Sequence, residues 1–268
     1  MMAAMAAPTL PHVALNDGTS IPQFGLGVYK VPADDTAALV AAALEMGYRH
    51  VDTAQQYGNE AGVGQGLRDS GVPREDVWIT TKLDDSAHSH DGAIAALDGS
   101  LERLGTDYVD LFLIHRPGPD DDVETWRGLE RLRADGRVRS VGLSNFDRRQ
   151  IDHLVEHTGL VPSVNQIRVN PRTPHRAMQR YHRRRGIATE SWGPLREGRL
   201  VEHPTARKVA ARVGRTPAQV VLRWHLQQGI IVFPKSANPQ RLRENLDVAD
   251  FELSRRDMAA ISRMRRWR

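Results

Sequence analysis

Short apolar runs alternate along the chain with longer segments of helical periodicity. Eight runs read as β-strands: 24–27, 48–52, 77–82, 108–115, 138–144, 163–167, 186–191 and 229–235. Between them, segments such as 34–47, 90–105 and 147–159 carry apolar residues at helical spacing. Each of these three segments ends in glycine, which favours helix termination. The repeated βα order is typical of a closed (β/α)8 barrel.

The spacing of strand ends supports this fold. Asp52, Lys82, His115 and Ser144 end four consecutive strands and lie 30, 33 and 29 residues apart, close to the roughly 30 residues of a βαβ unit. An open doubly wound sheet is the competing fold, but no GxGxxG motif follows the first strand.

Three features fall outside the eight repeats. The turn Asn16-Asp17-Gly18 between strand-like residues predicts an N-terminal β-hairpin. Residues 203–228 form two helical stretches separated at 214–217, and 253–268 form a further helical stretch. The acidic run 120–122 is typical of the polar start of a helix. We therefore predict an α/β fold: a TIM barrel with an N-terminal hairpin and extra C-terminal helices, in a single domain spanning 1–268.

Composition narrows the class of partner. The net charge is +4, from 37 basic and 33 acidic residues spread along the chain, which argues against nucleic acid. No apolar run approaches the roughly 20 residues that span a bilayer. The N-terminal MMAAMAAPTL lacks a basic n-region, and the chain has no cysteine, so we expect a cytoplasmic protein. No HExxH motif occurs, and His88 and His90 fall in a polar segment, so no metal is expected.

Four residues with ionisable side chains are expected to lie together at one end of the barrel. Asp52, Lys82 and His115 each end a strand, and Tyr57 follows Asp52 by five residues. Active sites of such barrels lie at the carboxyl ends of the strands. Only four of the 37 basic residues are Lys, which singles out Lys82 and Lys235, because an ammonium has a pKa that its surroundings can tune.

These four residues are suited to carbonyl reduction. Hydride addition leaves negative charge on the carbonyl oxygen, so the site needs hydrogen-bond donors and a proton source. Tyr57 is the proposed proton donor, and Lys82 is expected to lower its pKa from the usual value of about 10. Asp52 would keep Lys82 charged, and His115 would donate to the carbonyl oxygen.

Seven segments together resemble the aldo-keto reductase superfamily, most closely its bacterial 2,5-diketo-gluconate reductase-like branch. They are YRHVDTAQQYGNE (48–60), ITTKL (79–83), DLFLIHRP (110–117), VGLSNF (141–146), VNQIRVNP (164–171), ESWGPL (190–195) and FPKSANPQRLRENLDV (233–248). The resemblance implies NADPH-dependent reduction of aldehydes or ketones by a monomer. Its catalytic tetrad corresponds to the same four residues: Asp52, Tyr57, Lys82 and His115.

The resemblance also implies a cofactor site. Trp192 would stack on the nicotinamide, with Gly193, Pro194 and Leu195 beside it, while Ser144, Asn145 and Gln166 would bind the carboxamide. Lys235, Ser236 and Arg241 would bind the adenosine 2′-phosphate near the start of a helix, with Glu244 and Asn245 near the adenine. NADPH should therefore be preferred over NADH.

The chain departs from the family pattern in places that concern the substrate. Arg116 stands where the family usually has Trp, which suggests recognition of carboxylate-bearing carbonyl substrates; the alternative is that Arg116 points to solvent. Arg168 stands where Glu is common, a change beside Gln166. Tyr29 and Trp78 are candidate pocket aromatics, with core packing as the alternative. The chain ends at Arg268 without the loop that covers the pocket in many relatives, which predicts a broad substrate range.

Two other functions are compatible with parts of the pattern. A Schiff-base aldolase would use Lys82 as nucleophile, which requires Lys82 to be unpaired. A non-enzymatic barrel could bind the nucleotide only as a sensor, although the full tetrad disfavours this.

Overall fold

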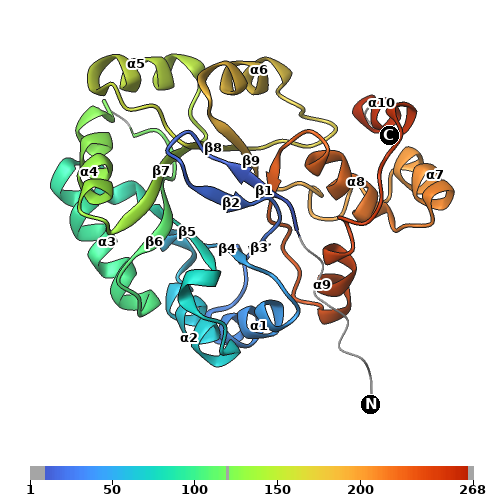
Figure 1. Ribbon diagram of the computed structural model, residues 1–268, viewed down its shortest axis with the longest axis horizontal. Helices are drawn as coiled ribbons and strands as arrows, with labels where there is room; N and C mark the ends of the chain where they lie inside the picture. The colour runs from blue at the N-terminus through green and yellow to red at the C-terminus, as the bar shows by residue number, and fades with distance from the viewer. Residues whose placement is uncertain (1–9, 119–120, 265–268) are drawn as a thin grey trace.

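A parallel eight-stranded sheet forms the centre of the protein (Figure 1). The computed structural model describes residues 10–118 and 121–264. The strands, all adjacent in sequence order, are β3 (Leu26–Gly27), β4 (His50–Asp52), β5 (Trp78–Leu83), β6 (Val109–Ile114), β7 (Val138–Ser144), β8 (Val164–Ile167), β9 (Ala188–Ser191) and β10 (Ile231–Val232). Each corresponds to one of the eight predicted runs.

The sheet closes on itself between its last strand and the segment before its first. Phe24 forms a parallel bridge with Val232. The Gly25 amide donates to the Val232 carbonyl at 2.8 Å, and the Val232 amide donates to the Gln23 carbonyl at 3.0 Å. The predicted (β/α)8 barrel is confirmed.

Helices surround the strands. They are α1 (Ala33–Glu45), α2 (Glu60–Ser70), α3 (His90–Leu104), α4 (Val123–Ala134), α5 (Arg148–Thr158), α6 (Arg176–Arg185), α7 (Pro204–Val213), α8 (Pro217–Leu226), α9 (Pro239–Leu246) and α10 (Arg255–Ser262), with short 3-10 turns η1 (Gln55–Tyr57), η2 (Arg74–Asp76) and η3 (Asp85–Ala87). As predicted, α3 and α5 end at glycines in the left-handed conformation, Gly105 and Gly159. Helix α1 ends slightly earlier, at Glu45, and Gly47 follows with a positive φ.

Side-chain caps set several helix starts in the extra C-terminal region. Thr216 and Ser254 form capping boxes at α8 and α10. Asp121 accepts a hydrogen bond from the Val123 amide at the start of α4, as the acidic run predicted, while Asp120 lies outside the described residues. Residues 265–268 of the last helical stretch also lie outside them.

Over residues 10–118 and 121–264, no helix combines the length and apolar character needed to cross a membrane.

The predicted N-terminal hairpin crosses one end of the barrel (Figure 1). Strands β1 (His12–Ala14) and β2 (Ser20–Pro22) pair antiparallel. Leu15 and Ile21 pack in a buried cluster with Trp78, which is 6% exposed, and with the strand residues Leu111, Leu113, Val164 and Ile231. The prediction of Trp78 as a pocket aromatic is therefore wrong: Trp78 begins β5, so it faces the hairpin at the amino ends of the strands.

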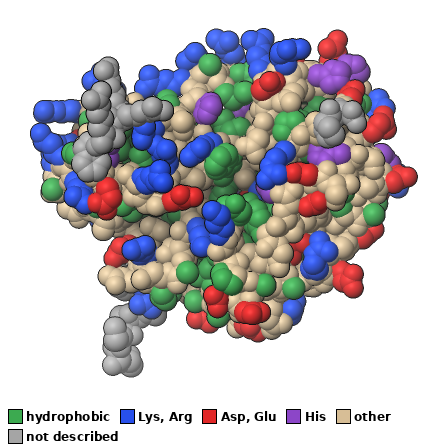
Figure 2. Space-filling view, turned by 180° about the vertical axis from the view of Figure 1, so that it is seen from behind, with side chains coloured by type: hydrophobic (Ala, Val, Ile, Leu, Met, Phe, Trp, Pro, Cys, Tyr) green, Lys and Arg blue, Asp and Glu red, His purple; other side chains and the backbone are tan. Residues whose placement is uncertain are grey.

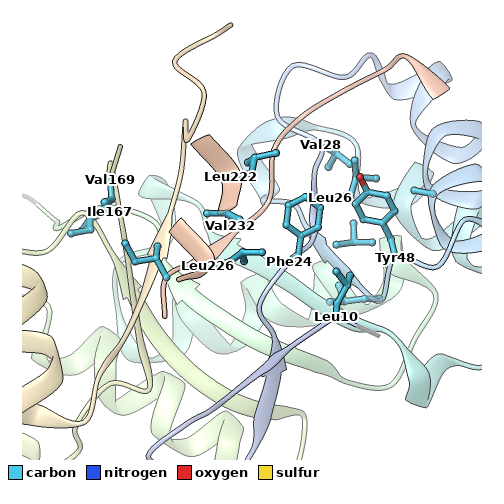
Figure 3. Packing of buried hydrophobic residues seen from close by; sticks show 14 of the residues in the cluster. Leu10, Phe24, Leu26, Val28, Tyr48, Ile167, Val169, Leu222, Leu226 and Val232 are labelled. Atoms are coloured by element: carbon cyan, nitrogen blue, oxygen red, sulfur yellow. The ribbon is translucent and has the colours of Figure 1, made fainter. Parts of the chain in front are cut away.

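A second apolar region joins the C-terminal helices to the start of the barrel (Figure 3). Phe24 and Tyr48 pack with ring centroids 5.9 Å apart, and Leu222 and Leu226 of α8 belong to the same cluster. Tyr48 is fully buried, and its hydroxyl donates to the Leu242 carbonyl of α9 at 3.0 Å. This packing fixes α9 beside the barrel.

Candidate active site

A cleft of about 2040 Å³ opens at the carboxyl ends of the strands. Figure 2 shows the face opposite the hairpin, where Lys and Arg side chains surround a central region with hydrophobic side chains. The cleft is lined by Asp52 at the end of β4, Tyr57 in η1 and His115 directly after β6. It extends from these residues to the start of α9.

Lys82 lies at the floor of the site with no exposed surface. Its Nζ donates to Asp52 Oδ1 at 2.8 Å and to the Thr53 carbonyl at 2.7 Å, and lies 3.4 Å from Tyr57 Oη. Burial alone lowers the pKa of Lys82, but the Asp52 carboxylate and Tyr57 outweigh burial and raise it above its usual value. Lys82 is therefore a charged ammonium at neutral pH.

Tyr57 presents its hydroxyl between Lys82 and the cleft. Its ring lies edge-on to the His115 ring, with centroids 5.8 Å apart. Burial raises the pKa of Tyr57 above 10, and the Lys82 charge opposes this shift without reversing it. Lys82 therefore acts on the pKa of Tyr57 in the expected direction, but the net shift is upward, because loss of solvent disfavours the phenolate more than one ammonium favours it. Tyr57 is thus a protonated phenol.

His115 is 7% exposed and uncharged near neutral pH. Burial, with smaller effects from Lys82 and Arg116, lowers its pKa to about 4. Its Nδ1 is buried with no hydrogen-bond partner among the described residues. A neutral imidazole still carries one N–H, so His115 can donate a hydrogen bond without carrying a charge.

The predicted carboxamide-binding residues lie near the carboxyl ends of β7 and β8, with Asn145 directly after β7. Trp192 Nε1 donates to Asn145 Oδ1 at 2.9 Å, and Asn145 Nδ2 donates to the His115 carbonyl at 3.2 Å. Asn145 has a φ of 64°, a left-handed conformation that Asn tolerates better than most residues. Gln166 Nε2 donates to Asp52 Oδ2 at 2.9 Å. Amide and hydroxyl groups therefore border the four candidate catalytic residues on one side.

The predicted phosphate-binding residues lie at the other end of the cleft. Asn238 caps α9 by accepting from the Gln240 and Arg241 amides, and the residues Lys235, Ser236, Arg241, Glu244 and Asn245 line the cleft beside it. Lys235 Nζ donates to the Lys30 carbonyl at 2.7 Å, and within residues 10–118 and 121–264 neither Lys235 nor Arg241 is paired with a carboxylate. Two uncompensated cations at a helix N-terminus suit a phosphate dianion.

These two ends together fit a nicotinamide dinucleotide phosphate. Polar groups suited to a carboxamide lie beside the tetrad, and cations suited to a phosphate lie at α9. Gly193, Pro194 and Leu195 line the same cleft. A cleft with this charge distribution matches a ligand that is polar and uncharged at one end and anionic at the other.

The candidate substrate residues lie at the mouth of the cleft. Tyr29 lines it, is 55% exposed and packs on Tyr57 with ring centroids 5.0 Å apart. Arg116 also lines it, and its Nη1 forms an ion pair with Asp85 Oδ2 at 2.5 Å. Arg116 is therefore neither buried nor free in solvent, but paired with a half-exposed carboxylate.

Several residues of the site were not predicted from the sequence. Asp85 pairs with Arg116, and the Thr53 carbonyl holds Lys82. Arg168 was expected only as a change beside Gln166, and its guanidinium lies 5.3 Å from the Trp192 ring centroid. Glu190, within the ESWGPL segment, is fully buried beside Gln166. A carboxylate in the middle of a buried strand was the one signal that could have identified Glu190.

Comparison with known proteins agrees with this geometry. The model of the aldo/keto reductase family matches residues 21–266. An aldo-keto reductase of Mycobacterium sp. (strain JLS) is 53% identical over 254 residues, covering 94% of this chain and 92% of its own. A glyoxal reductase of Bacillus subtilis is 42% identical over 250 residues, covering 93% and 91%. A crystal structure of a Gox0644 mutant in complex with NADPH has a TM-score of 0.92 at 44% identity, covering 97% and 95%.

The fold and the site define an oxidoreductase that reduces carbonyl compounds with a nicotinamide cofactor. The chain belongs to the aldo/keto reductase family. Its cofactor is NADP(H), as in the structural neighbours solved with NADPH or NADP bound.

Proposed function

We propose that this enzyme reduces small dicarbonyl or keto-acid substrates, 2,5-diketo-gluconate among the candidates, to alcohols with Tyr57 as the proton donor. The observation that carries the proposal is the placement of the Tyr57 hydroxyl at the cleft, 3.4 Å from the buried ammonium of Lys82. We propose that in the cell the reaction runs in the direction of carbonyl reduction, with oxidation of NADPH.

The residues divide the work of proton transfer. When bound, NADPH would supply the hydride. Trp192 would support the nicotinamide, and its carboxamide would be oriented by Ser144, Asn145 and Gln166. Tyr57 gives its proton to the carbonyl oxygen as charge develops there, and Lys82 stabilises the phenolate that remains. Asp52 keeps Lys82 charged at 2.8 Å, and the neutral His115 donates a hydrogen bond that orients the carbonyl.

An aldolase mechanism fits this site poorly. A Schiff-base lysine must lose its proton to attack a carbonyl. Lys82 is fully buried and ion-paired with Asp52, and its pKa is raised by that pairing despite burial. Lys82 is therefore suited to stabilise a phenolate and not to act as a nucleophile.

The ion pair at the mouth of the cleft supports the proposed substrate class. Arg116 offers a guanidinium at the cleft, and its partner Asp85 is half-exposed, so exchanging that partner for a substrate carboxylate costs little. The similarity to a glyoxal reductase supports small dicarbonyls as the second group of proposed substrates, beside the keto acids. We therefore propose that both keto acids and neutral dicarbonyls are accepted.

The test is a panel of neutral aldehydes, dicarbonyls, keto acids and sugar dicarbonyls, followed by NADPH oxidation. We expect kcat/KM to be highest for the dicarbonyl and keto-acid members. Equal or higher kcat/KM for simple monoaldehydes throughout the panel would contradict the proposed substrate class.

We further propose that the enzyme acts as a cytoplasmic monomer. A monomer is what the resemblance to the aldo-keto reductase superfamily implies, and a chain without cysteine needs no oxidising compartment. Light scattering at several protein concentrations tests the oligomeric state, and a stable dimer would contradict it.

A further inference from the structure

Glu190 is a buried carboxyl group to which the mechanism above gives no role. It lies on β9 and has no exposed surface. Its Oε2 accepts a hydrogen bond from Gln166 Nε2 at 2.9 Å, and its Oε1 has no partner among the described residues. Burying a carboxyl group is costly, so its placement beside a cofactor-binding residue calls for a reason.

The Gln166 amide is held by two carboxyl groups at once. The same Nε2 donates to Asp52 Oδ2 and to Glu190 Oε2, each at 2.9 Å. An amide nitrogen has two hydrogens, and both are used here. The reversed amide would set its carbonyl oxygen against the Asp52 carboxylate, so the two acceptors favour one orientation. The Gln166 Oε1 is left without a hydrogen-bond partner among the described residues, on a side chain that lines the cleft.

Glu190 can accept the hydrogen bond from Gln166 without adding a second negative charge beside the Lys82–Asp52 pair. Burial, with a smaller effect from Asp52, raises the pKa of Glu190 to about 8, so it is neutral at pH 7. A proton on Oε1 leaves Oε2 free to accept from Gln166. The buried cluster then holds one ammonium and one carboxylate, which balance each other.

We propose that Glu190 is a positioning residue which, with Asp52, fixes the Gln166 amide so that Gln166 Oε1 accepts a hydrogen bond from the nicotinamide carboxamide NH2. The inference rests on the proposed function, because it assumes that Gln166 binds the carboxamide. Glu190 itself touches neither cofactor nor substrate in this account. It acts through Gln166.

The test compares NADPH with its reduced 3-acetylpyridine analogue, in which a methyl group replaces the carboxamide NH2. Dissociation constants are measured by fluorescence titration for the wild type and for Glu190→Met, which keeps the side-chain volume and removes the acceptor. We expect the wild type to bind NADPH about tenfold more tightly than the analogue, as one hydrogen bond allows. In Glu190→Met, where only Asp52 still opposes the reversed amide, this ratio should fall about threefold.

Two further variants separate positioning from packing. Glu190→Gln keeps an acceptor oxygen for Gln166 and should keep the wild-type ratio, whereas Gln166→Leu removes the amide itself and should lower the ratio to about unity. If Glu190→Met does not fold, Glu190→Asp withdraws the acceptor by one methylene and should lower the ratio. An unchanged ratio in the acceptor-removing variants overturns the inference.

The binding experiment distinguishes a failure of this inference from a failure of the proposed function. If wild type and Gln166→Leu both bind the two cofactors equally, the proposed carboxamide contact of Gln166 is wrong, and the role of Glu190 falls with it. If Gln166→Leu lowers the ratio and Glu190→Met does not, only the role of Glu190 is wrong. The readout is binding alone, so it does not depend on turnover or on Tyr57.

Discussion

At the scale of single residues, the site depends on charges held out of water. Lys82, fully buried, is paired with Asp52 and donates also to a backbone carbonyl. Tyr57 stays protonated because burial outweighs the nearby ammonium. In the proposed mechanism, the phenol releases its proton only as negative charge develops on the substrate oxygen, and the ammonium of Lys82 stabilises the phenolate that results.

The pair Arg116–Asp85 yields a prediction about substrate charge. Asp85→Asn removes the carboxylate that competes for Arg116, so KM for keto acids should fall several-fold while KM for neutral aldehydes changes little. Arg116→Ala should raise KM for keto acids selectively. Steady-state kinetics with a matched keto acid and neutral aldehyde measure both ratios. A KM ratio that neither variant alters would show that Arg116 does not bind the substrate carboxylate.

At the scale of elements, the position of a residue within its strand decides whether its side chain lies at the cleft or at the hairpin end of the barrel. Asp52 and Ser144 end their strands and line the cleft, whereas Trp78 begins its strand and packs on the hairpin. The eight strands and three predicted helices followed from hydrophobic periodicity. Trp78 was misassigned because its place at the start of the run was not used. The Arg116–Asp85 pair could not be foreseen, because it joins different βα loops through side-chain geometry.

Helix α9 yields a prediction about cofactor choice. Lys235→Ala or Arg241→Ala should each weaken NADPH binding about tenfold or more and change NADH binding little, because only NADPH carries the 2′-phosphate. Lys208→Ala, an exposed charge on α7 that does not line the cleft, is the matched control. Calorimetric dissociation constants for both cofactors give the ratio. Equal losses for NADH and NADPH would remove these residues from the phosphate site.

At the scale of the whole molecule, buried titratable groups tie the fold to pH. Burial lowers the pKa of His182 and His225 to about 4 each and of His50 to about 3, well below the 6.5 of an exposed histidine. These imidazoles are uncharged in the folded protein. Their titration could not be anticipated from the sequence, which shows eleven histidines but not which are surrounded by the core.

The sign of the histidine contribution follows from the lowered pKa values. Between pH 6.5 and 4 the unfolded chain binds more protons at these histidines than the folded protein does, so their contribution to the free energy of unfolding falls as the pH is lowered. Glu190, whose pKa burial raises to about 8, contributes in the opposite direction. Between pH 7 and pH 5 each histidine should cost about 2 kcal/mol of stability. Urea unfolding at these two pH values, compared between the wild type and His182→Gln, measures the contribution of His182, and a pH slope that this variant leaves unchanged would contradict a neutral buried His182.

The proposed mechanism depends most directly on Tyr57 as the proton donor. Single-turnover oxidation of bound NADPH by a dicarbonyl substrate, compared between wild type and Tyr57→Phe, isolates the chemical step. We predict that the rate falls at least 100-fold while the dissociation constant for NADPH stays within about twofold, because phenylalanine keeps the ring that packs against Tyr29 and His115. A Tyr57→Phe enzyme that reduces the substrate at the wild-type rate would contradict the mechanism.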